Sequence, residues 1–134
     1  MLTQKELRSG LLQFRQIDGW YHHWLDQFVF SDGVKWLCDQ CDCRWLLTEI
    51  AFFQLRIRSD YQKLEPFQIW HLKRQPNASV LLECRGGSSQ TPFIRDQLNS
   101  VEFALDEMTL WLVNGMLLLP SEYSEVYLQV KMTA

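Results

Sequence analysis

Apolar residues recur with a helical period in the first half of the chain and with a strand period in the second half. A capping box formed by Thr3 and Glu6 predicts the start of a short N-terminal helix. From Ser31 to Cys41, apolar residues recur at helical spacing, and a second, more apolar helix is predicted from Trp45. The two later helices are expected to form a packed pair, with the second one largely buried.

The strand period begins at Phe67. Along residues 67–73, Gln68, Trp70 and Leu72 fall on one side, and the odd-numbered residues fall on the other. A turn at Pro76-Asn77 leads into a partner strand at residues 79–84, and residues 91–95 and 126–130 are weaker strand candidates.

Two apolar runs within residues 108–120 meet at Asn114-Gly115. This dipeptide favours a two-residue hairpin turn, because both central residues of a type I′ turn need positive φ. In neither run do apolar and polar residues alternate. Both faces of the hairpin should therefore be covered, or one face should be covered and the other should be an exposed apolar surface. The hairpin is expected at the centre of the sheet, with the opposed pairs Val113 and Met116, Leu112 and Leu117, Trp111 and Leu118, and Leu110 and Leu119.

Helices that precede strands indicate an α+β fold. We expect an antiparallel meander sheet that ends in the Asn-Gly hairpin, with the helical pair packed on one face. The length of 134 residues is that of a single domain, residues 1–134, which can bury a core without disulfides. The six Trp and eight Phe are expected mainly to form that core.

Charge and hydropathy narrow the possible partners. The formal net charge is −3, from 13 basic and 16 acidic residues, which does not favour nucleic acid as a partner. No apolar run has the length of a signal peptide or a membrane span. We therefore expect a cytoplasmic protein that does not bind a membrane and whose cysteines are reduced.

Cys38, Cys41 and Cys43 are the sharpest candidates for metal chemistry, since thiolates three residues apart on a helix can share one face. A zinc site of this kind normally has a second pair of ligands, which is missing here. Free cysteine also packs as a small apolar residue. We expect no cofactor, and these three cysteines are only weak metal candidates.

His22 and His23 lie between two tryptophans, where an imidazole could transfer protons or contact a ligand. Adjacent residues of a strand point to opposite faces, so only one of the two can enter a single site. No nucleophile or orienting carboxylate has a suitable spacing, and we expect a protein that is not an enzyme.

Four blocks of sequence resemble a known family in their order and spacing: Trp20-Tyr-His-His-Trp-Leu25, Ser31-Asp-Gly-Val-Lys-Trp-Leu37, Trp45-Leu-Leu-Thr-Glu-Ile-Ala51 and Leu117-Leu-Leu-Pro-Ser-Glu-Tyr123. The chain resembles an uncharacterised bacterial domain family, domain of unknown function 6876, found in cyanobacteria and mobile elements. The resemblance covers most of residues 18–123. It implies one compact domain and brings no activity, cofactor or catalytic residue.

Two helices are too few to cover both faces of the predicted sheet. The predicted function is therefore a non-enzymatic protein-interaction module, by analogy an inhibitor or adaptor, which binds a protein partner or a second copy as a homodimer. The alternative is a small-molecule or nucleotide-binding domain with His23, Glu49 and His71 in an aromatic cavity. A small metal-dependent enzyme is the third reading. The expected interface residues are Trp70, Trp111, Leu118, His23 and His71.

Overall fold

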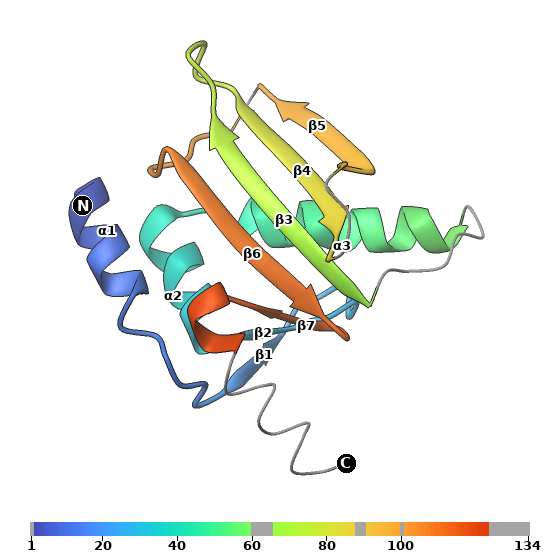
Figure 1. Ribbon diagram of the computed structural model, residues 1–134, viewed down its shortest axis with the longest axis horizontal. Helices are drawn as coiled ribbons and strands as arrows, with labels where there is room; N and C mark the ends of the chain where they lie inside the picture. Colours follow the sequence, from blue (N-terminus) through green and yellow to red (C-terminus); the bar gives the residue numbers. More distant parts are fainter. Residues whose placement is uncertain (1, 60–65, 88–90, 100, 124–134) are drawn as a thin grey trace.

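The computed structural model describes residues 2–59, 66–87, 91–99 and 101–123, which form a seven-stranded sheet and three α-helices (Figure 1). The strand order is β1-β2-β7-β6-β3-β4-β5. The strand predicted at residues 126–130 lies outside the described residues. The helices are α1 (Gln4–Leu11), α2 (Asp32–Cys41) and α3 (Arg44–Ser59), followed by the 3₁₀ turn η1 (Pro120–Glu122); the strands are β1 (Trp20–His22), β2 (Val29–Ser31), β3 (Phe67–Arg74), β4 (Val80–Gly86), β5 (Ile94–Leu98), β6 (Glu107–Val113) and β7 (Met116–Leu118).

The sheet is mixed, so the predicted pure antiparallel meander is wrong. β2 runs parallel to β7, with Val29 beside Met116 and Phe30 beside Leu117. The other neighbouring strands are antiparallel. β2 carries no signal in the sequence because it has three residues and pairs with a segment near the other end of the chain. Hydrophobic periodicity and turn residues are local signals, so neither predicts the pairing of two segments that are far apart in the sequence.

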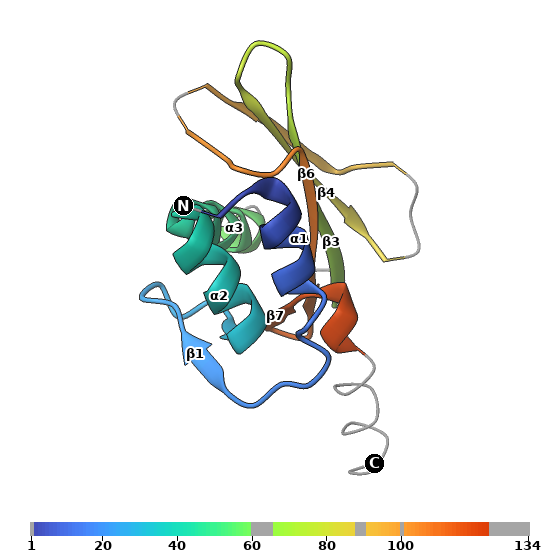
Figure 2. The same cartoon turned by 90° about the vertical axis from the view of Figure 1, so that its left-hand side faces the viewer.

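All three helices lie on one side of the sheet, as Figure 2 shows for β3, β4 and β6. The capping box of α1 is confirmed: the Thr3 amide donates to the Glu6 carboxylate at 3.0 Å, and the Glu6 amide donates to the Thr3 hydroxyl at 3.2 Å. Ser31 caps α2 by accepting a hydrogen bond from the Val34 amide at 3.2 Å. These caps fix where both helices begin.

The predicted alternation along β3 is confirmed, and it directs alternate residues of this strand into the core. Trp70 is fully buried, and its indole N–H donates to the Gln68 side-chain oxygen at 3.0 Å. Gln68 and Gln54 then exchange two amide hydrogen bonds of 2.8 and 2.9 Å. This buried polar pair links β3 to α3 and satisfies groups that would otherwise be costly to bury.

β6 and β7 are antiparallel neighbours joined by Asn114 and Gly115, which have φ angles of 49° and 81°. Asn and Gly tolerate this left-handed backbone better than other residues. β6 is the central strand of the seven. The observed pairs place Trp111 opposite Leu118, Leu112 opposite Leu117, and Val113 opposite Met116.

A small second cluster covers one end of the sheet on the side away from the helices. It is built on Val113 and Leu118, which are buried. Ile17 and Trp20 from the chain around β1, and Tyr123 after η1, pack against these two residues. This cover reaches Phe67 of β3 and Trp111 of β6, where Tyr123 packs against the indole ring. It leaves β4, β5 and the other ends of β3 and β6 without a second layer on this side among the described residues.

A fully buried carboxyl group joins η1 to the start of α2. Glu122 accepts hydrogen bonds from the Ser31 hydroxyl at 2.6 Å and from the Leu119 amide at 2.8 Å, both at Oε1. Oε2 and the buried Oδ1 of Asp32 complete no well-aligned hydrogen bond among the described residues, although the Gly33 amide is close enough to Glu122 to lower its pKa. Glycine is required at position 33, because a Cβ there would lie 2.7 Å from Glu122 Oε2.

Replacing Glu122 by glutamine is expected to stabilise the protein at neutral pH. Burial is the main cause that raises the pKa of Glu122 above 4.5, and the nearby Asp32 raises it further. Because the folded-state pKa is raised, the contribution of Glu122 to folding stability is fully present below about pH 4.5 and is lost as the pH rises through the folded-state pKa. The Glu122→Gln variant cannot ionise, so we expect a gain on the order of 1 kcal/mol at pH 7.

Urea unfolding of both proteins from about pH 4 to about pH 8 measures this difference. The two stability curves should diverge as the pH rises. Curves that stay parallel across the range would show that the Glu122 carboxyl is not strained by its burial.

Candidate functional site

The side of β3, β4, β5 and β6 that faces away from the helices is covered by no helix in the described part of the chain (Figure 2). We call it the open face. Along each strand, alternate residues are buried and face the helices. The residues between them therefore point to the open face. The residues of the open face are Ile69, His71, Lys73, Leu81, Glu83, Arg85, Arg95, Gln97, Glu107, Thr109 and Trp111.

The open face is hollowed toward the end that borders the second cluster. A depression of about 540 Å³ lies over β3, β4 and β6, and its lining includes Ile69, Trp111, Thr109 and Glu83. Ile69 lies directly opposite Trp111 across β3 and β6, and both side chains are half-buried. A protein surface with an aromatic and an aliphatic residue in a depression, rimmed by polar groups, is typical of interaction sites.

Charges of both signs surround the depression that holds Ile69 and Trp111. His71 contacts the Glu107 carboxylate, and Arg95 lies directly opposite Glu83 across β4 and β5. Lys73 is exposed beyond His71 on β3. Because cations and carboxylates alternate here, the open face carries no single strong field that selects an oppositely charged partner.

The structure separates the residues predicted for the interface. Trp111 and His71 lie on the open face, whereas Trp70 is fully buried against the helices. Leu118 is on the open side but fully buried in the second cluster, and His23 lies near the start of α3.

Several residues of the open face were absent from the prediction. Leu81, Glu83 and Arg95 alternate with the buried residues of β4 and β5 in the same way as His71 does on β3. The strand period was therefore the available signal for Leu81 and Glu83. The sequence gives a weaker signal for Arg95, because it predicts only an uncertain strand over residues 91–95, whereas β5 begins at Ile94.

His23 is a structural residue whose ring nitrogens are both engaged. Nδ1 accepts a hydrogen bond from the Leu25 amide at 3.2 Å, so Nε2 carries the proton and contacts the Thr48 hydroxyl at 3.3 Å. Burial lowers the pKa of His23, which favours this neutral ring. His23 thus ties the loop after β1 to α3, and neither nitrogen is available for a metal ion or a reacting group.

Cysteines and carboxylates form no metal centre in the described residues. Cys38 and Cys43 are buried, Cys41 is half-buried, and all three are free thiols. The neighbouring thiols of Cys38 and Cys41, together with burial, raise the pKa of Cys43. No group of three or more His, Cys, Asp or Glu side chains within residues 2–59, 66–87, 91–99 and 101–123 is arranged to hold a metal ion.

Glu49, the third residue predicted for a ligand cavity, is half-buried on α3. Burial is the main cause that raises its pKa, and the nearby Asp96 on β5 raises it further. It does not line the depression of the open face.

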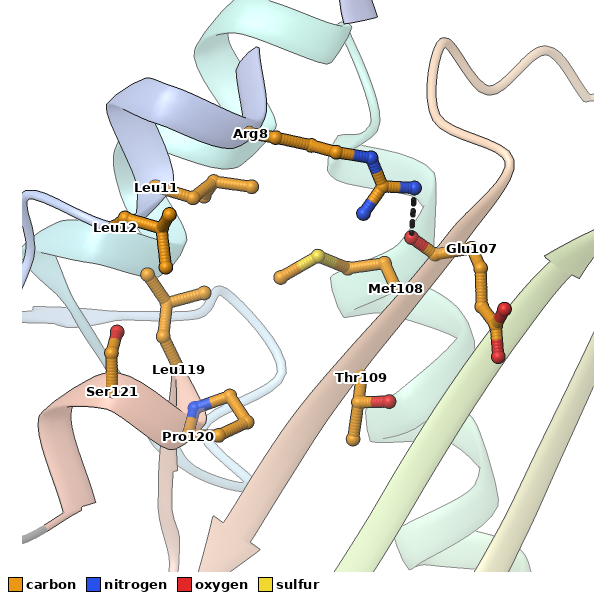
Figure 3. A pocket seen from close by; sticks show the side chains of 9 residues that line it. All are labelled: Arg8, Leu11, Leu12, Glu107, Met108, Thr109, Leu119, Pro120 and Ser121. Atoms are coloured by element: carbon orange, nitrogen blue, oxygen red, sulfur yellow. Dashed lines mark hydrogen bonds between the residues drawn. The ribbon is translucent and has the colours of Figure 1, made fainter. Parts of the chain in front are cut away.

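A second depression, of about 440 Å³, lies between α1, β6 and η1 (Figure 3). Leu11, Leu12, Met108 and Leu119 point into it, and Arg8 donates a hydrogen bond across its rim to the Glu107 carbonyl at 3.4 Å. Leu12 is largely exposed. This groove is narrower than the open face and offers few polar groups to orient a ligand.

None of the helices in the described part of the chain is both long and apolar enough to cross a lipid bilayer. Searches of the curated proteins and of the solved structures found no match. A protein-family model described as a family of unknown function, DUF6876, matches residues 5–123. The match spans both the helical layer and the strands of the open face. The chain therefore belongs to the DUF6876 family.

Proposed function

We propose that this protein is an interaction module whose open face binds a second copy of the same chain. The observation that carries the proposal is the one-sided helical cover: among the described residues, the helices lie on one side of the sheet. On the other side, Ile69 and Trp111 remain partly exposed in the depression. Burying a few aromatic and aliphatic residues of this kind supplies most of the binding energy at protein interfaces.

The charge pattern supports a second copy as the partner. A two-fold interface brings the same patch of both chains together, so the patch must be complementary to itself. The open face carries Lys73, Arg85 and Arg95 together with Glu83 and Glu107. A two-fold axis near Ile69 and Trp111 would allow cations of one chain to approach carboxylates of the other.

The size of the open face indicates a dimer of moderate strength. Four strands about 4.8 Å apart, with about seven residues of about 3.3 Å each, project an area on the order of 400 Å². A standard interface buries about 800 Å² of accessible surface on each partner. The accessible area of the open face is larger than its projected area, because side chains stand out from the sheet, so the open face is at most of about standard size. Because obligate dimers usually bury much larger interfaces, we expect a dimer that dissociates on dilution rather than an obligate one.

Light scattering coupled to size-exclusion chromatography tests this proposal on the full chain, loaded from about 1 μM to about 1 mM. We expect the mass to rise with concentration from one chain of 16.0 kDa toward twice that value. A mass that stays at one chain up to the highest concentration would overturn the proposal. A constant mass of three or more chains would also contradict it, since a two-fold face closes after two copies.

A further inference from the structure

A separate hollow of about 450 Å³ lies between the β1–β2 hairpin and the corner where α2 meets α3. Its volume falls in the range of small-molecule sites. It takes no part in the open face, because its lining comes from the other end of the sheet and from the helices. Its lining includes Tyr21, His23, Trp24, Lys35, Asp39 and Arg44.

Trp24 gives this hollow an aromatic rim that is exposed and yet held in place. The side chain is 72% exposed, the largest exposure among the described large apolar residues. His23 supports it from the protein side, with the two ring centroids 5.6 Å apart. The turn is closed by the Asp26 amide, which donates to the His23 carbonyl at 2.9 Å. An exposed indole offers a flat apolar surface on which a ligand ring can stack.

Tyr21 provides a second aromatic wall. Its ring stacks on Phe30 with centroids 5.7 Å apart, and the Lys35 ammonium lies 5.5 Å from the Tyr21 centroid. This arrangement places a cation beside the aromatic surface.

The polar wall of the hollow has more positive than negative charge. Asp39 accepts from Lys35 Nζ at 2.6 Å and from Arg44 Nη2 at 3.0 Å. These two hydrogen bonds lower the pKa of Asp39, so this carboxylate stays ionised and cancels one of the two cations. The side chains that line the hollow therefore sum to one positive charge, and Asp42, which does not line it, also lies near Arg44. The guanidinium of Arg44 has further N–H donors, since an arginine carries five.

We propose that this hollow binds a small planar aromatic molecule that carries one anionic group, the chemistry presented by a nucleoside monophosphate. The ring stacks against Trp24, and the anion lies near Arg44 and Lys35. Stacking and charge act together in this arrangement, so a ligand that has only the ring or only the anion binds more weakly.

Titration of the ¹⁵N-labelled full chain with adenosine monophosphate, followed by NMR of the tryptophan indole N–H signals, tests the inference. We expect a saturable shift of the Trp24 signal at millimolar ligand or below. Adenosine and ribose 5-phosphate should each bind at least about tenfold more weakly. No shift with adenosine monophosphate, or equal binding of either fragment, would overturn the proposal.

Variants separate this site from nonspecific binding. Trp24→Ala should weaken binding by about tenfold, whereas Trp24→Phe, which keeps a ring, should retain most of it. Arg44→Gln should weaken binding of adenosine monophosphate and leave binding of adenosine unchanged. The matched control is Phe52→Ala, which removes an exposed aromatic residue of α3 that does not line the hollow. Equal binding by Trp24→Ala and wild type would contradict the assignment.

Discussion

Replacing Trp111 by alanine is expected to raise the dissociation constant of the dimer by at least about 30-fold, which corresponds to about 2 kcal/mol for a central aromatic residue. Trp111 lines the depression of the open face and lies opposite Ile69. Its ring also contacts Phe67 and Tyr123, with centroids 5.4 and 5.1 Å away. We therefore expect a smaller loss of folding stability, about 1–2 kcal/mol, in the same variant. Sedimentation equilibrium and urea unfolding measure the two effects separately.

Leu81→Asp provides an independent second variant, because Leu81 lies on β4 between Lys73 and Gln97 of the neighbouring strands. It should weaken the dimer without touching the aromatic cluster around Trp111. The matched control is Phe52→Ala on the helical side, which should dimerise like wild type. Dimerisation that survives both sheet variants and fails in the control would place the interface on the helices instead.

Replacing Trp70 by alanine is expected to cost about 3–5 kcal/mol of folding stability, the range for a large aromatic residue removed from a core. Trp70 is fully buried, and its ring lies 5.6 Å from that of Phe53 on α3. The substitution also removes the indole donor that the Gln68 oxygen accepts. This is a large part of the roughly 5–15 kcal/mol that stabilises a typical domain.

Urea unfolding of Trp70→Ala and Trp70→Phe measures this loss. The phenylalanine variant keeps most of the buried ring and should recover more than half of the stability. A loss below about 1 kcal/mol for Trp70→Ala would show that Trp70 is not a core residue. Such a result would favour the interpretation from the sequence that Trp70 is an interface residue.

The local part of the fold could be predicted from the sequence. Helix starts at Thr3 and Ser31 depend on side chains that bond to nearby amides, and alternation along β3 depends on the two-residue strand period. The parallel pair of β2 and β7 could not be predicted, because it joins two three-residue strands by backbone hydrogen bonds that any residue can make. That pair makes the sheet mixed.

The candidate site could be predicted only in part. Trp70 and His71 are neighbours on β3, so they face opposite sides of the sheet, and only one of them can belong to the open face. The sequence does not decide which side the helices cover, because both sides of β3 and β6 carry apolar residues. Leu118 shows a related limit: it faces the open side, yet Trp20 and Tyr123 from distant segments pack over its end of the sheet.

Intermolecular cross-linking tests most directly whether two chains meet through the open face. An equimolar mixture of isotope-labelled and unlabelled chains, treated with a zero-length carbodiimide, joins lysines to carboxylates that are in contact, and mass spectrometry recognises the mixed pairs. We predict mixed cross-links from Lys73 of one chain to Glu83 or Glu107 of the other. Mixed cross-links found only at Lys5 of α1 or Lys35 of α2, with none at Lys73, would contradict the proposed interface.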